Sequence, residues 1–111
     1  MYNFNNRKFQ LLENSENGET SPETTFYYKQ NKNIVTADYR GGTISYGKII
    51  AILENDSLNM LYQCVTTNEE LKAGKAVAKI NKVNGKIKLS LNWEWLDGSG
   101  SKGQSEYVEI D

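Results

Sequence analysis

The segment Asn92–Ser105, NWEWLDGSGSKGQS, contains the strongest candidate for a chemical motif in this chain. Its glycines Gly98, Gly100 and Gly103 have the G-x-G-x-x-G spacing of a loop that cradles a phosphate with backbone N–H groups. That loop must follow a strand and open a helix within a unit of roughly 30 residues. Only eight residues follow Gly103, and they alternate as a strand does. The spacing therefore predicts a wide turn between two strands and no nucleotide site.

Histidine is absent from the sequence, which removes the commonest general base near neutral pH and every site built on it. The lone Cys64 alternates with Met60 and Tyr62, so we expect a buried thiol with no cationic partner to lower its pKa. A catalytic pair would have to combine Glu94 with a lysine, and Glu94 falls on the outer face of its predicted strand. An enzyme is not ruled out, but the residues favour a non-catalytic protein with no catalytic side chains, no metal and no cofactor.

Six lysines and no acidic residue lie between Leu71 and Leu89. With Trp93 and Trp95 nearby, such a basic stripe could bind single-stranded nucleic acid through charge and base stacking. However, 13 basic and 14 acidic residues leave a net charge of -1, and the alternation separates the outward lysines from the inward aromatic rings. We therefore expect no nucleic-acid partner.

The longest unbroken apolar run is Ile49–Leu53, far shorter than the roughly 20 residues of a membrane-spanning helix. The first residues lack the charged-then-apolar order of a secretory signal, and Cys64 cannot form an intramolecular disulfide. We therefore expect no membrane association and a cytoplasmic location.

The elements that must position these residues are strands. From about residue 26 onward, apolar residues recur at every second position, as in strands with one face on a core. The pattern is clearest over residues 87–95, where five large apolar side chains share one face and polar side chains the other. The alternation and the turn residues between runs predict about eight strands, near residues 7–13, 24–30, 33–40, 43–54, 57–66, 71–83, 86–96 and 104–110.

All predicted connections after the first are short, so neighbouring strands are expected to be antiparallel. The pair Asn84-Gly85 is the strongest turn signal, because a type I′ hairpin needs positive φ at both central residues. Eight such strands satisfy their edges best in a closed, all-β, up-and-down barrel of the calycin-like kind. A two-sheet β-sandwich is the alternative, because alternation does not distinguish closure from stacking. The prediction is one domain over residues 1–111, with residues 13–23 an exposed acidic loop.

The interior of an eight-stranded barrel is either filled by side chains or holds one small ligand. A packed aromatic core is the first outcome. The second is a ligand cavity near the Trp95 end, with tryptophans as walls and tyrosine hydroxyls as orienting groups. The predicted cavity-lining residues are Tyr28, Tyr39, Tyr62, Leu89, Trp93 and Trp95.

Several stretches resemble a family of small bacterial proteins labelled N-acetylglutamate synthase. They are NSENGETSPETTFYYKQ (14–30), ADYRGGTISYGKIIA (37–51), MLYQ (60–63), NGKIKL (84–89) and WEWLDGSGSKGQS (93–105). The resemblance covers most of the chain and implies a compact β protein, and the label implies N-acetyl transfer. Acetyl transfer of the usual kind needs a helix N-terminus for the pyrophosphate of its cofactor, and the chain has no long helical period.

These observations lead to one prediction with two alternatives. The prediction is a small, non-catalytic β-barrel, monomeric or homodimeric, that binds a small hydrophobic or aromatic ligand at one barrel mouth. The alternatives are a protein-interaction module without a ligand and an N-acetyltransferase as the family label implies.

Overall fold

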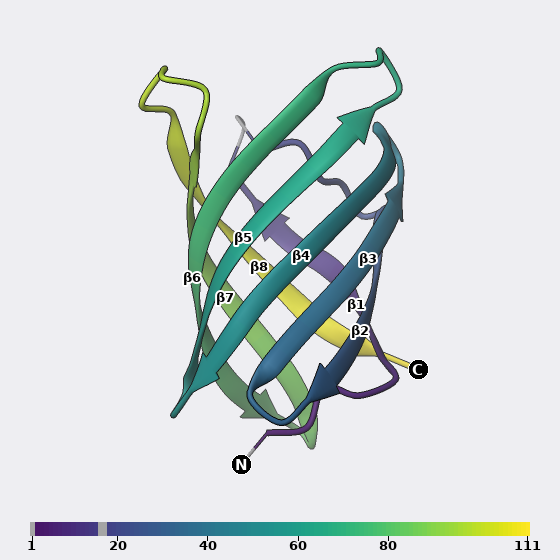
Figure 1. Ribbon diagram of the computed structural model, residues 1–111. Coiled ribbons are helices and arrows are strands. Elements are labelled where there is room, and N and C mark those ends of the chain that lie inside the picture. The colour runs from purple at the N-terminus through teal and green to yellow at the C-terminus, as the bar shows by residue number, and fades with distance from the viewer. Residues whose placement is uncertain (1, 16–17) are drawn as a thin grey trace.

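The computed structural model describes residues 2–15 and 18–111, and within them eight antiparallel strands close into a barrel in sequential order (Figure 1). The prediction of an up-and-down barrel is confirmed, and the sandwich alternative is wrong. No predicted strand boundary differs from the observed one by more than two residues. The strands are β1 (Arg7–Asn14), β2 (Thr25–Asn31), β3 (Ile34–Gly41), β4 (Ile44–Glu54), β5 (Ser57–Thr66), β6 (Leu71–Val83), β7 (Lys86–Trp95) and β8 (Lys102–Ile110).

The strands form where apolar and polar residues alternate, because successive side chains of a strand point to opposite faces. In β7, the five inward side chains from Ile87 to Trp95 are all buried. The inward positions of β6 carry small residues, among them Gly74, Ala76 and Ala78. A barrel wall with small side chains on one strand and large ones on its neighbour fills part of the interior and leaves room elsewhere.

The turns follow the chemistry of their residues. Asn84 and Gly85 both have positive φ, 52° and 80°, as a type I′ turn requires. Gly98 and Gly100 also have positive φ, and they lie in the turn that joins β7 to β8. The glycine-rich loop is therefore a hairpin connection, as predicted. Gly103 differs from the prediction, because it belongs to β8 and takes no part in the turn.

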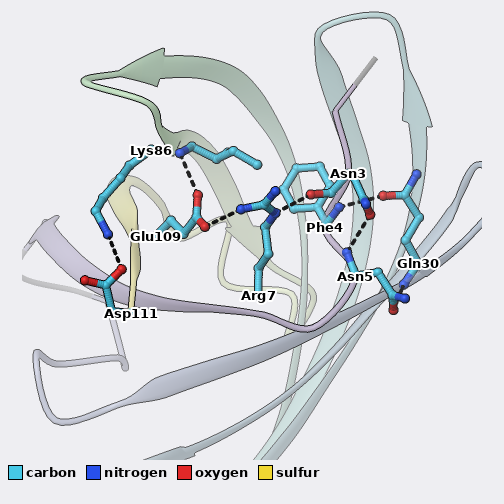
Figure 2. A network of polar contacts seen from close by, with 9 residues as sticks. Asn3, Phe4, Asn5, Arg7, Gln30, Lys86, Glu109 and Asp111 are labelled. Atoms are coloured by element: carbon cyan, nitrogen blue, oxygen red, sulfur yellow. Dashed lines mark hydrogen bonds and ion pairs between the residues drawn. The ribbon is translucent and has the colours of Figure 1, made fainter.

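The segment before β1 seals the end of the barrel at which both chain termini lie (Figure 1). The side chain of Phe4 is fully buried there, with ring centroids 5.9 Å from Phe9 and 5.6 Å from Tyr28. The backbone N–H of Phe4 donates to the side-chain oxygen of Gln30 at 2.8 Å, as Figure 2 shows. Phe4 thus acts as a plug held by a specific hydrogen bond.

An ion pair between Arg7 and Glu109 ties the start of β1 to the end of β8 beside this plug (Figure 2). The second carboxylate oxygen of Glu109 accepts the backbone N–H of Ile87 at 3.0 Å. Burial raises the pKa of Glu109, but the Ile87 N–H and the Arg7 guanidinium outweigh it and hold this pKa below its ordinary value.

Within the described residues, no helix has the length and apolar character needed to cross a membrane.

Candidate functional site

The barrel end opposite the termini contains a cavity of about 50 Å³, enough for about three water molecules. The void lies among aromatic side chains, so the aromatic residues do not fill the interior completely. Its lining residues come from the β1–β2 connection and from every strand except β6, whose residues Gly74, Ala76 and Ala78 are small where they pair with the lining residues of β7. They are Asn14, Gly18, Glu19, Thr20, Phe26, Tyr28, Tyr39, Ile44, Ile49, Met60, Tyr62, Cys64, Leu91, Trp93, Trp95, Ser105 and Tyr107.

Five of the six residues predicted to line a cavity do so: Tyr28, Tyr39, Tyr62, Trp93 and Trp95. Leu89 does not line this cavity, and the role of all six residues in binding a ligand stays a prediction. Leu89 points inward as expected, but it lies four residues before Trp93, toward the closed end, and is fully buried. Alternation predicts the face on which a side chain lies, whereas its height in the barrel depends on strand register.

Each of three aromatic cavity residues lies over a glycine on the neighbouring strand. Tyr62 is paired with Gly74 across β5 and β6, and a Cβ added to Gly74 would lie 2.4 Å from the Tyr62 ring. The glycine thereby gives the ring space against the barrel wall, and the centre of the barrel stays open. The three pairs are Tyr39–Gly47, Tyr62–Gly74 and Trp93–Gly103.

A chain of hydrogen bonds crosses one wall of the cavity. The indole N–H of Trp93 donates to Ser105 Oγ at 2.7 Å, and the Ser105 hydroxyl donates to Asn14 Oδ1. Asn14 Nδ2 in turn donates to the backbone oxygen of Thr20 at 3.0 Å, and the hydroxyls of Thr20 and Tyr107 are 2.8 Å apart. The inward alternation of β8 contained a signal for Ser105 and Tyr107 that the sequence analysis did not use.

The buried tyrosines and the cysteine on the cavity wall are held in their neutral forms. Burial raises the pKa of Tyr28, Tyr39 and Tyr62 well above that of a free phenol, and the Tyr39 hydroxyl donates to the backbone oxygen of Gln63 at 3.3 Å. Cys64 is buried, as predicted, and burial raises the pKa of its thiol, although Lys72 is a cationic neighbour that acts in the opposite direction. The wall therefore combines apolar rings with uncharged donors and acceptors.

The connection between β1 and β2 lies over the mouth of this cavity, and the prediction of an exposed loop over residues 13–23 is only partly right. Glu13 and Asn14 belong to β1, residues 18–21 are half-buried, and Pro22 and Glu23 are exposed. Residues 16 and 17 of the predicted loop lie outside the described residues. Composition identified a turn-rich segment, but it did not reveal that residues 18–20 line the cavity.

Glu19 links the β1–β2 connection to the turn between β3 and β4 and to the start of β6. Its carboxylate is 3.0 Å from the ammonium of Lys72, and it also accepts the hydroxyl of Thr43. The Lys72 ammonium lies 4.4 Å from the centroid of the Trp95 ring, within the range of a cation–π contact. The negative charge of Glu19 is thus balanced by an ion pair and a hydrogen bond at the rim of the cavity.

One lysine of the basic stripe, Lys72, lies over the Trp95 ring, whereas Lys86 and Lys88 form ion pairs on the outer surface. Lys86 pairs with Asp111 at 2.7 Å, and Lys88 with Glu106 at 3.4 Å, on the outer surface. Both tryptophan rings point into the barrel, so they form no exposed stacking platform on its outer surface. Within the described residues, no three His, Cys, Asp or Glu side chains gather as a metal site.

The comparisons with known proteins agree with the barrel. A family model described as "Avidin-like protein" matches residues 2–110. Neither the curated proteins nor the solved structures contain a match to the chain. The resemblance to proteins labelled N-acetylglutamate synthase is corrected by this finding, and the acetyltransferase alternative falls with it. The stretches on which that resemblance rests are mainly turns and strands with alternating apolar and polar residues. Any small barrel built from closely spaced hairpins needs both. The chain belongs to the avidin-like protein family.

Proposed function

We propose that the protein binds a small, uncharged ligand with a planar ring in the cavity at the barrel mouth, without catalysing a reaction. The observation that carries this proposal is a void enclosed by two tryptophans, four tyrosines and a chain of neutral polar groups. Ligand sites typically combine apolar walls with a few placed polar groups in this way. Avidin-like proteins bind small ligands such as biotin, which supports the same kind of function.

The chemistry of the wall restricts the ligand. Burying a charge without a partner is costly, and Glu19, the charged residue on the lining, is already paired with Lys72. Asn14, Ser105 and Tyr107 offer both hydrogen-bond donors and acceptors at one side of the rings. A ring that carries an adjacent amide, urea or hydroxyl group matches this surface best.

The size of the void implies movement when a ligand enters. A volume of about 50 Å³ is well below the roughly 300 Å³ at which sites for larger ligands begin. The segment of residues 18–24 lies over the mouth through Glu19–Lys72, Glu19–Thr43 and Thr20–Tyr107 contacts. These exposed or half-buried contacts are individually weak, so lifting this segment is the route by which a ligand of biotin size would enter.

Tryptophan fluorescence tests the proposal directly, because both tryptophans of the chain line the cavity. We expect saturable emission changes on titration with at least one of two uncharged probes, biotin amide and benzamide. The variant Ser105→Ala should weaken that binding about tenfold, the usual effect of losing one hydrogen bond in a buried site. The control Tyr27→Phe, on the outer face, should bind as the wild type does. Emission unaffected by both probes at millimolar concentration, or equal binding by the Ser105→Ala variant, would contradict the proposal.

A further inference from the structure

The carboxylate of Glu19 lies at the mouth of the cavity and is held there by two groups. Its side chain is 21% exposed, with Lys72 Nζ 3.0 Å from Oε1 and the Thr43 hydroxyl donating to Oε2. The same hydroxyl lies 3.0 Å from the backbone oxygen of Glu19. A glutamine at this position would cover the mouth equally well and accept the Thr43 hydroxyl. Covering the cavity therefore does not explain why the residue is charged.

The turns around the mouth are acidic. The four turns that join β1 to β2, β3 to β4, β5 to β6 and β7 to β8 lie at this end of the barrel (Figure 1). Their described residues include five acidic side chains and no basic one, namely Glu19, Glu23, Glu69, Glu70 and Asp97. The basic residues at the adjoining strand ends are Arg40, Lys72 and Lys102. The described part of the rim is therefore negative on balance, even with these three cations counted.

Lys72 acts on more than one of these carboxylates. Besides its contact with Glu19, its charge reaches Asp97, whose pKa is lowered first by hydrogen bonds from Ser99 and then, to a smaller extent, by Lys72. The Lys72 ammonium also lies 4.4 Å from the centroid of the Trp95 ring. An anion that arrives at the mouth would thus compete with two carboxylates of the chain for this cation.

The negative charge of Glu19 is also felt at the cavity wall. The pKa of the Cys64 thiol is raised mainly by burial, and a hydrogen bond with Tyr39 opposes this rise. Of the two rim charges that act on the thiol, Glu19 raises this pKa more than Lys72 lowers it. The two charges therefore do not cancel at this point of the wall, and the remaining potential is negative. Low-dielectric walls focus such a potential on a molecule that enters.

We propose that Glu19 is a specificity-determining residue that excludes anions, carboxylates above all, from the cavity, so that the protein takes neutral amides and alcohols and rejects the corresponding acids. The inference rests on the proposed function and names the class of ligand that the same site refuses. An entering carboxylate would meet the like charge of Glu19, and pairing with Lys72 would leave Glu19 without its partner. A built-in repulsion of this kind is a general source of specificity.

A purely structural role for Glu19 predicts a different outcome. If the ion pair only fastened the β1–β2 connection, its loss from either side would open the mouth equally to every solute. If Glu19 excludes anions, Glu19→Gln admits them. Lys72→Gln should exclude them further, because the charge of Glu19 is then no longer balanced. The two variants should therefore shift the selectivity for anions in opposite directions.

Quenching of tryptophan fluorescence measures this selectivity without a ligand, because both tryptophans of the chain line the cavity. Iodide is an anionic quencher and acrylamide is a neutral one. At constant ionic strength, the ratio of the iodide to the acrylamide quenching constant should rise about threefold in Glu19→Gln and fall below the wild-type value in Lys72→Gln. The control Glu54→Gln removes the same charge at the opposite end of the barrel and should leave the ratio unchanged. A ratio that stays constant in both rim variants, or moves in the same direction in both, would overturn the inference.

Binding of benzamide and benzoate separates this inference from the proposed function. The wild type should bind benzamide at least about tenfold more tightly than benzoate. Glu19→Gln should raise the ratio of benzoate to benzamide affinity about fivefold, and Glu54→Gln should not change it. Benzoate bound as tightly as benzamide by the wild type would overturn the inference and leave the proposed function standing. Absence of benzamide binding would count against the proposed function, and the quenching ratios would still decide whether Glu19 excludes anions.

Discussion

Tyr62 and Gly74 face each other across β5 and β6, and the ring of Tyr62 occupies the space where a side chain at residue 74 would lie. The same relationship joins Tyr39 with Gly47, so glycines at inward positions are what allow the rings to lie against the wall. An aromatic ring that lies against the wall bounds a cavity, whereas one that points to the barrel axis fills it. The open mouth thus depends on residues that have no side chain.

Gly74→Ala should close the cavity. The new methyl group would lie 2.4 Å from the Tyr62 ring and force it toward Trp95, whose ring centroid is 5.8 Å away. Overpacking of this kind costs about 1–3 kcal/mol. Urea unfolding should show this loss, and the tryptophan titration should show weaker binding. A Gly74→Ala variant as stable as the wild type, with ligand binding intact, would show that the ring has room elsewhere.

Ser105→Ala should destabilise the fold as well as the site. It removes the acceptor of the buried Trp93 indole N–H and the donor to Asn14. An unsatisfied buried donor costs about 1–3 kcal/mol, so thermal unfolding should occur at a lower temperature. Ser90→Ala is the control, because Ser90 bonds Glu106 at the outer surface and should be nearly neutral. Equal melting temperatures of the two variants would mean that the indole finds another partner.

Stability should decrease at alkaline pH. The folded-state pKa values of Tyr28, Tyr39 and Tyr62 are raised by burial above the value of about 10 in the unfolded chain. The unfolded state therefore releases these protons first, and the free energy of unfolding falls as pH rises above about 10. Tyrosinate absorbance should show these three tyrosines ionising together with unfolding. Ionisation of these three tyrosines while the protein is still folded would contradict the burial described above.

Glu109→Gln should weaken the closed end of the barrel in a pH-dependent way. The pKa of Glu109 is lowered in the folded state, so its contribution is present above the unfolded value of about 4.5 and is lost as pH falls through the folded value. The partly exposed ion pair with Arg7 and the bond from Ile87 N–H suggest a loss on the order of 1 kcal/mol at neutral pH. Urea unfolding should show this difference at pH 7 and a smaller one near pH 3. A difference that is equal at both pH values would assign the effect to packing.

Local sequence patterns predicted most of the fold. The alternation of β7 and the Asn84-Gly85 turn depend on neighbouring residues, and both were correctly predicted. The contact between Asn14 and Ser105 was not, because it exists only after β1 pairs with β8 to close the barrel. That pairing also contains a register shift between Leu11 and Glu13, which no local pattern indicates.

The other differences between the prediction and the structure arise from contacts between residues that are distant in sequence. Glu19 lies in a segment of polar and turn-forming residues, yet it pairs with Lys72, which is 53 residues away. Leu89 was placed on the correct face, but its height in the barrel depends on eight strand registers at once. The cytoplasmic location and the single-domain organisation stay predictions.

The central claim is that the aromatic cavity at the barrel mouth binds a small uncharged ligand. The most direct measurement is a nuclear magnetic resonance titration that follows the indole N–H signals of Trp93 and Trp95, the two tryptophans of the chain. We predict that biotin amide or a small aromatic amide shifts both signals in a saturable way, and that Gly74→Ala weakens this binding. Indole signals that stay in place while a ligand perturbs only the outer face, or that respond to no ligand up to millimolar concentration, would contradict the account.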